Sequence, residues 1–141
     1  MAIETSLVLL KTDCVQKHLC GEVIKRFENA DFVIRGVKML EMSDALLEEH
    51  YAHIADRPFF PELVAFMTET PVIAVAVAGE NAIERVRDLL GPTDSTAALP
   101  GTIRGDFGVD MMKNIAHASD STENAAIELE RFFEAGEVFD Y

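Results

Sequence analysis

One histidine, His117, stands among small residues in the stretch NIAHASDS, where its surroundings could support chemistry. The polar residues after it predict a helix start at Asp120 or Ser121, and the free N–H groups and dipole of a helix start attract anions. A histidine beside such a site could attack phosphorus as a nucleophile while an acceptor holds its other ring nitrogen. Glu128, directly or through Ser119, could be that acceptor. A core histidine near a helix cap is the alternative interpretation.

Several basic residues stand in otherwise acidic or loop surroundings. Lys11 ends a predicted strand, Arg57 precedes the sequence PFF, Arg87 lies on a predicted helix, and Arg104 lies in a predicted loop. Phosphate chains need several such donors, because charge-assisted hydrogen bonds hold both the position and the charge of each phosphate. For any one of these cations taken alone, a solvated surface position is the simpler explanation.

The overall charge restricts the class of ligand. The chain of 141 residues has a formal net charge of −13 and a pI near 4.5. An acidic surface repels nucleic acid and anionic lipid at long range, so we expect no stable nucleic-acid binding. The longest apolar run, at 71–78, is too short to span a bilayer, and the first residues lack the basic region of a signal peptide. We therefore expect a cytoplasmic protein without membrane association.

The two cysteines and the other histidines do not form a metal site by their spacing. On one continuous helix Cys14 and Cys20 would point about 240° apart, so we expect two reduced thiols that cannot reach each other. Cys14 with His18, and His50 with His53, could each share a helical face. Neither pair has the third and fourth ligands of a zinc site.

The hydrophobic pattern predicts alternating strands and helices. Strands are expected at 5–11, 31–42 and 71–79. Helices are expected at 21–30, at 44–54 after a Ser43 cap, from about Pro61, and at 82–90 between Asn81 and Gly91. A last helix is expected at 122–133, with Ala126, Leu129 and Phe133 facing inward. Turn formers at 92–108 predict a long loop, and a short strand should then lead into NIAHASDS. The aromatic C-terminal tail is expected to dock on a neighbouring subunit. This order predicts an α/β (α+β) fold of the ferredoxin-like split βαβ type, a four-stranded antiparallel sheet covered by helices, in one domain over 1–141.

Seven stretches together resemble the nucleoside diphosphate kinase family. They are LVLLKTD, GEVIKRFENADF, KML, RPFFPELVAFM, TPVIAVAVAGENAI, GPTDSTAALPGTIRGDFG and NIAHASDS, and they follow the order and spacing of that family from Ser6 to Phe133. The resemblance therefore covers nearly the whole chain, and PGTIRGDF and the histidine motif are its most specific parts.

The resemblance implies a ping-pong phosphotransferase. His117 would take the γ-phosphoryl group of a nucleoside triphosphate and return it to another nucleoside diphosphate, with Ser119 and Glu128 orienting the ring and Lys11 assisting. Asp120 would lie near a Mg²⁺ cofactor that bridges the phosphates through water. Phosphates and ribose would contact Lys11, Tyr51, Arg87, Thr93, Arg104 and Asn114, and the base would stack on Phe59 beside Leu63 and opposite Met111. Members of the family are homo-oligomers, so a hexamer or tetramer is expected.

Three positions depart from the family pattern. Thr12 replaces a proline, Met111 a valine or isoleucine, and Ala118 the glycine that follows the histidine. Because Ala118 enters a helix cap from an extended segment, we expect its φ angle to be negative and the alanine to be tolerated. The main alternative is a member that binds nucleotides with impaired turnover and acts as a structural or regulatory partner. A phosphohistidine relay to another protein and a plain ligand-binding module explain fewer of the aligned cations.

Overall fold

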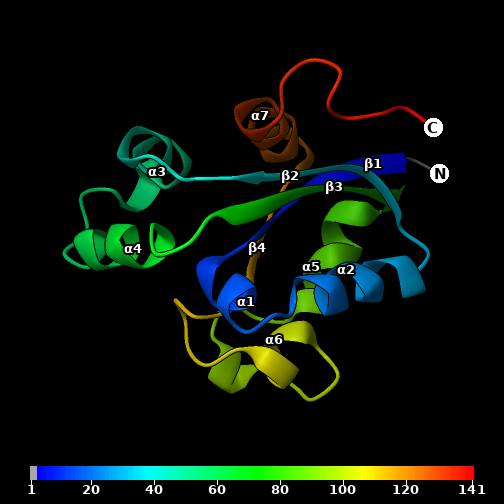
Figure 1. The fold of residues 1–141 in the computed structure, drawn as a ribbon. Helices are drawn as coiled ribbons and strands as arrows, with labels where there is room; N and C mark the ends of the chain where they lie inside the picture. The colour runs from blue at the N-terminus through cyan, green and yellow to red at the C-terminus, as the bar shows by residue number, and fades with distance from the viewer. Residues whose placement is uncertain (1–2) are drawn as a thin grey trace.

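The computed structural model describes residues 3–141 and contains one antiparallel sheet (Figure 1). The strands are β1 (Ile3–Leu10), β2 (Val33–Leu40), β3 (Val72–Glu80) and β4 (Ala116–Ala118), in the order β2-β3-β1-β4. Every neighbouring pair is antiparallel. The predicted α+β fold with a four-stranded antiparallel sheet is confirmed.

The two central strands are apolar on both faces because helices cover both faces. Leu7 and Leu9 of β1 point into a cluster with residues of α3 (Asp44–His50), α4 (Phe60–Met67) and α7 (Thr122–Phe132). Val8 and Leu10 point the other way, toward α2 (Cys20–Asn29) and α5 (Ala82–Leu90). Alternate side chains of a strand face opposite sides of its sheet, so an unbroken apolar run indicates burial on both sides. Figure 1 shows α3 and α7 on one side of the sheet and α2 and α5 on the other.

The helix boundaries follow local signals in several places. Ser43 and Ser121 accept hydrogen bonds from Leu46 N and Asn124 N, which confirms both predicted caps. Gly91 ends α5 with a φ of 89°, a conformation that glycine adopts without steric cost. Asn81 occupies the N-cap position of α5, but its side chain makes no capping hydrogen bond.

Other expectations about the elements are wrong in detail. Segment 92–108 is not a plain loop, because it contains the 3₁₀ turn η2 (Ser95–Ala97) and the short helix α6 (Ile103–Phe107). Strand β4 includes His117 itself instead of leading into it. Helix α7 ends at Phe132 and buries Ala125 and not Ala126. Of the three residues expected to face inward, Phe133 is buried and Leu129 packs against the core, so the expectation is wrong only at Ala126.

The expected separation of the two cysteines is also wrong. Cys14 lies in α1 (Thr12–Gln16) and Cys20 begins α2, so they do not share one helix. Between them His18 adopts a left-handed φ of 59°, and the chain turns back. The two Sγ atoms come within 3.8 Å of each other.

The C-terminal tail packs along its own chain, and its expected contact with a neighbouring subunit stays a prediction. Phe139 N donates to Arg35 O at 2.9 Å, and the Tyr141 hydroxyl donates to Ile34 O, so the tail follows strand β2. The aromatic rings of Phe139 and Tyr141 remain exposed. Across residues 3–141, none of the helices combines the length and the apolar character that crossing a membrane requires.

Candidate active site

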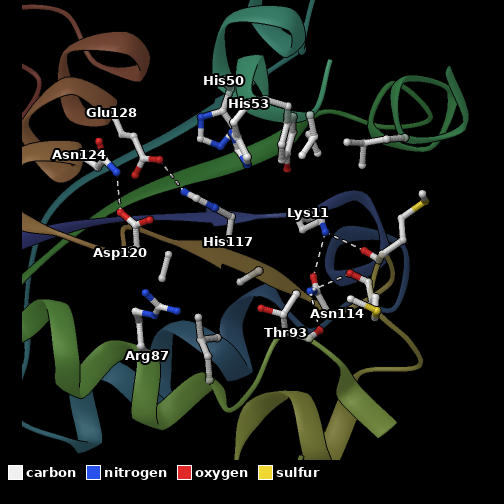
Figure 2. A pocket seen from close by; sticks show the side chains of 18 of the residues that line it. Lys11, His50, His53, Arg87, Thr93, Asn114, His117, Asp120, Asn124 and Glu128 are labelled. Atoms are coloured by element: carbon white, nitrogen blue, oxygen red, sulfur yellow. Dashed lines mark hydrogen bonds and ion pairs between the residues drawn. The ribbon is translucent and has the colours of Figure 1, made fainter. Parts of the chain in front are cut away.

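The predicted site residues come together around one cavity of about 930 Å³. Such a volume is typical of a small-molecule site. All of the predicted residues except Ser119 line it, and they come from α4, α5, α6, α7, β4 and the segments between elements. Figure 2 shows the labelled side chains converging on this space. Arg57 does not line the cavity and is exposed, so the simpler surface interpretation applies to it.

A chain of hydrogen bonds orients His117. The strand β4 pairs with β1 so that His117 lies opposite Leu9. The ring Nε2 of His117 lies 2.9 Å from Glu128 Oε2 (Figure 2). The other oxygen of Glu128 accepts from the Ser119 hydroxyl at 2.6 Å. Ser119 Oγ in turn accepts from Leu7 N at 3.1 Å. These hydrogen bonds thus fix the orientation of the imidazole relative to the backbone of the central strand β1.

The protonation of Glu128 decides which nitrogen of His117 carries the proton. Burial favours the neutral acid, but hydrogen bonds from His117 and Ser119 outweigh it and lower the pKa of Glu128 below its usual value. The ionised carboxylate has no proton to donate, so the hydrogen on the 2.9 Å contact belongs to Nε2. The neutral ring then carries its lone pair on Nδ1.

Lys11 and Asn114 form a second hydrogen-bonded unit. Lys11 precedes α1, and its Nζ donates to Asn114 Oδ1 at 2.9 Å and to Met112 O at 2.7 Å. Asn114 Nδ2 donates to the backbone oxygens of Thr93 and Met111 at 3.0 and 3.1 Å. Burial lowers the pKa of Lys11 to about 8, although nearby Asp13 opposes this effect. A buried ammonium in this state gains strongly from an anionic ligand.

Arg104 donates hydrogen bonds to backbone carbonyls near His117 and at the end of α5. Its guanidinium donates to Asn114 O at 3.1 Å, to Gly91 O at 2.9 Å and to Ala116 O at 2.6 Å. Between two of these carbonyls Ile115 adopts a φ of 76°, which is unusual for a β-branched residue. Arg104 therefore stabilises a strained turn and still borders the cavity.

The remaining polar residues lie on the open side of the cavity. Arg87 projects from α5 and is exposed, and Thr93 follows the end of the same helix. Asp120 is exposed, and its Oδ1 accepts from Asn124 Nδ2 at 2.6 Å (Figure 2). A carboxylate and two groups suited to phosphate contacts thus face solvent, where a charged ligand can enter.

Three apolar candidate residues line the cavity, and two of them are exposed. Phe59 is 44% exposed and Met111 is 65% exposed, whereas Leu63 is buried. Large exposed apolar side chains that line a cavity can pack against an aromatic ligand. Tyr51 follows α3, and burial raises the pKa of its hydroxyl, which keeps it protonated.

Sequence reasoning missed His50 as a neighbour of the histidine. Its ring centre lies 4.5 Å from that of His117, in an edge-to-face arrangement, and its Nδ1 lies 2.8 Å from Arg131 Nη1. Burial first, and then the nearby His117, lower the pKa of His50 to about 3, so it stays neutral. The sequence signal that could have indicated this was the position of His50 directly before the candidate residue Tyr51. The sequence suggested only a pairing with His53.

One group of side chains within residues 3–141 could hold a metal ion: His50, His117 and Glu128, whose ligand atoms lie within 4.8 Å of one another. Two imidazoles with one carboxylate suit zinc or copper and not Mg²⁺, which prefers oxygen ligands. A magnesium ion would therefore fit Asp120 better than this group.

The departures from the family pattern cause no visible obstruction at the histidine. Ala118 lies in β4 and does not have a positive φ angle, as expected. Thr12 begins α1, where its buried hydroxyl has no hydrogen-bond partner among residues 3–141. Thr12 does not line the cavity, so the threonine at this position leaves the cavity unchanged.

Comparison with known proteins relates these residues to one family. The family model described as nucleoside diphosphate kinase matches residues 4–138. The nucleoside diphosphate kinase of Rubrobacter xylanophilus is 51% identical over 131 residues, which cover 93% of this chain and 98% of that protein. The sequence similarity thus includes every stretch that contributes to the cavity.

Solved structures agree with this relationship. A nucleoside diphosphate kinase of Aquifex aeolicus has a TM-score of 0.93 at 41% identity, covering 98% of this chain and 100% of that one. A halophilic nucleoside diphosphate kinase from Halobacterium salinarum, in complex with CDP, has a TM-score of 0.95 at 39% identity, covering 99% and 93%. Sequence, fold and the converging side chains all lead to one conclusion: the chain belongs to the nucleoside diphosphate kinase family.

Proposed function

We propose that this enzyme transfers the γ-phosphoryl group of nucleoside triphosphates to nucleoside diphosphates through a phosphohistidine at His117. The reaction class follows from the family, and the residue assignment is our proposal. The observation that carries it is the chain of hydrogen bonds from Ser119 through Glu128 to His117 Nε2. These bonds leave Nδ1 as the nucleophilic nitrogen, inside a cavity that Lys11 and Arg87 also line.

The transfer balances in two half-reactions. The lone pair of Nδ1 attacks the γ-phosphorus, the bond to the bridging oxygen breaks, and the nucleoside diphosphate leaves with that electron pair. The ring becomes positively charged, and ionised Glu128 stabilises it through the Nε2 proton. A second diphosphate then attacks the phosphorus and restores the neutral ring. Phosphoryl transfer depends mainly on positioning and on charge stabilisation, which fits a site with few reactive groups.

We assign different parts of the nucleotide to the polar residues and to the apolar residues of the cavity. We assign phosphates and ribose to Lys11, Tyr51, Arg87, Thr93, Arg104 and Asn114. The base would stack on Phe59, with Leu63 beside it and Met111 across the opening. Stacking uses the π face that every base has, so we expect broad tolerance of the base. The relative from Halobacterium salinarum was solved with CDP, which is consistent with a pyrimidine ligand.

We propose Mg²⁺ as the cofactor, held through water by Asp120. Mg²⁺ in nucleotide enzymes is usually bound by one or two carboxylates together with the phosphates of the substrate. Asp120 provides an exposed carboxylate at the edge of the cavity and fits this requirement. When bound, the ion would neutralise phosphate charge.

We further propose that the chain, as a single domain over 1–141, assembles into a homo-oligomer, a hexamer or a tetramer. Strand β2 lies at the edge of the sheet and exposes Val33, Val37 and Met39. Exposed apolar residues on an edge strand support an interface, because they otherwise promote uncontrolled pairing. Size-exclusion chromatography with light scattering would measure the assembly. The two free thiols support the proposed cytoplasmic location.

The decisive experiment combines an assay with labelling. The protein is mixed with ATP, Mg²⁺ and CDP, and we expect CTP together with an acid-labile, base-stable phosphate on the enzyme. His117→Ala should lose both the label and turnover. His53→Ala, which removes another histidine of the same cavity, should keep the label. A label that survives in His117→Ala would reject the assignment, and label without CTP would favour a member with impaired turnover.

A further inference from the structure

The two cysteines form a cluster of reactive groups outside the cavity. Cys14 and Cys20 are both free, and their Sγ atoms lie 3.8 Å apart. The chain holds them together through a tight turn, in which Leu19 N donates to Cys14 O at 3.0 Å and His18 has its left-handed φ. Two thiols in contact across a defined turn need only a small movement to form a bond.

The two thiols differ in a way that assigns their roles. Cys14 is fully buried, whereas Cys20 is partly exposed at the first position of α2. The Cys14 thiol donates to the sulfur of Cys20, and this hydrogen bond lowers the pKa of Cys20. The same contact, followed by burial, raises the pKa of Cys14. The reactive species is the thiolate, so Cys20 is the sulfur that meets an external reagent first.

We propose that Cys14 and Cys20 are a redox-active dithiol that a small-molecule disulfide of the glutathione type converts reversibly into an intramolecular disulfide. In the first step the Cys20 thiol loses its proton and attacks one sulfur of the reagent. The reagent's S–S bond breaks, and one thiolate leaves. Cys14 then loses its proton and attacks the sulfur of Cys20, which releases the second thiolate. Both released thiolates take up protons, so two protein thiols are oxidised and one reagent disulfide is reduced to two thiols.

Closure of this disulfide would act on the helix that enters the active site. A disulfide joins its sulfurs at about 2.0 Å, so the two atoms must approach by about 1.8 Å from 3.8 Å. Helix α1 has only five residues, follows directly after Lys11, and is tied to the histidine turn by the bond from Ile115 N to Asp13 Oδ2. The dithiol therefore couples the redox state to the position of Lys11.

Intact-mass measurement tests the reaction. The folded, reduced protein is incubated with glutathione disulfide and quenched with acid. We expect a loss of two hydrogens, no reaction with maleimide, and full recovery with dithiothreitol. Cys14→Ala should add one glutathione at Cys20 and stop there, whereas Cys20→Ala should stay unmodified because Cys14 is buried. A wild-type chain that keeps one glutathione, forms covalent dimers or retains both thiols would overturn the proposal.

Turnover tests the coupling to the site. The oxidised wild-type enzyme should turn over several-fold more slowly than the reduced enzyme, and dithiothreitol should restore the rate. Cys20→Ala treated with the same reagent is the matched control and should keep its rate. Equal turnover of oxidised and reduced wild-type enzyme would show that closure does not reach Lys11 and would overturn the coupling.

Discussion

At the scale of single residues, the site depends on where two protons lie. Glu128 is ionised and therefore fixes one proton on Nε2 of His117, which leaves Nδ1 as the nitrogen that we propose to be the nucleophile. Lys11 keeps its charge although burial lowers its pKa to about 8, so it is held close to its titration point. In the proposed mechanism, Glu128 orients the nucleophilic nitrogen of His117, and Lys11 responds to the charge of the bound phosphate.

The lowered pKa of Lys11 predicts a pH dependence of nucleotide binding. Below pH 8 the free enzyme carries the charge at Lys11, and above pH 8 it must first take up a proton to bind phosphate. The affinity for ADP should therefore fall as the pH rises, and the slope of log Kd against pH should approach one above pH 8. Calorimetry between pH 7 and 9.5 measures this slope. Lys11→Met should bind weakly with little slope, and an equal slope in that variant would assign the proton elsewhere.

The alanine after the histidine predicts a tolerated substitution. Ala118 lies in β4 without a positive φ angle, so glycine has no conformational role there. Ala118→Gly should keep turnover within a few-fold and lower the free energy of unfolding by about 0.5–1 kcal/mol, because glycine loses more entropy on folding. Steady-state kinetics and urea unfolding measure the two effects. A tenfold rise in turnover would mean that the methyl group obstructs the phosphate.

The sequence predicted most of the residues that line the cavity, because they lie in short motifs that match the family. The stretches around Lys11, Phe59, Arg104 and His117 match the family in order, and the cavity gathers these residues. One contact in the site could not be predicted in this way. The contact between His50 and His117 depends on packing between distant segments, which neither the helical period nor a lone residue type specifies.

At the scale of elements, a strained turn joins the loop region to β4. Ile115 has a φ of 76°, although an L-residue in this conformation costs about 1–2 kcal/mol. Three contacts hold it: Ile115 N donates to Asp13 Oδ2, Ile115 O accepts from Lys11 N at 2.9 Å, and Arg104 binds both flanking carbonyls. The turn therefore aligns α1, α6 and the strand that carries the histidine.

This turn predicts that Asp13 affects catalysis from a distance. Asp13→Ala leaves Ile115 N–H buried without a partner, which costs about 1–3 kcal/mol of unfolding free energy. Turnover should also fall, because the turn sets the position of His117 two residues later. Urea unfolding and steady-state kinetics on the same preparation test both expectations. Asp56→Ala removes an exposed carboxylate elsewhere and should change neither quantity, and a stable Asp13→Ala enzyme with full turnover would contradict this role.

Local signals explain which elements could be predicted. The serine caps before α3 and α7 and the glycine after α5 act on their own helix ends, so the sequence identifies them. The separation of α1 from α2 depends on His18 in a left-handed conformation, which is uncommon for residues other than glycine. The short helices within 92–108 are likewise fixed by contacts with the rest of the chain, such as Arg26 Nη1 to Asp106 Oδ2 at 2.8 Å.

At the scale of the whole molecule, the negative charge and the phosphate site oppose each other. The chain carries a formal net charge of −13, yet its cavity must attract anionic nucleotides. The cations that line the cavity act at short range, where a low dielectric strengthens them, whereas the surface charges act at long range through solvent. Salt screens the long-range repulsion more strongly than the contacts inside the cavity.

The excess charge therefore predicts that salt stabilises the folded chain. Like charges across a compact surface repel one another, and the repulsion is screened as the Debye length falls from about 10 Å at 0.1 M to about 3 Å at 1 M salt. The Tm in KCl should rise over this range, most steeply at the low end. Scanning calorimetry at pH 7.5 measures the shift, and sucrose at matched water activity is the control for effects other than screening. A Tm that falls with KCl would indicate that ion pairs such as Lys38 with Glu137 outweigh the net repulsion.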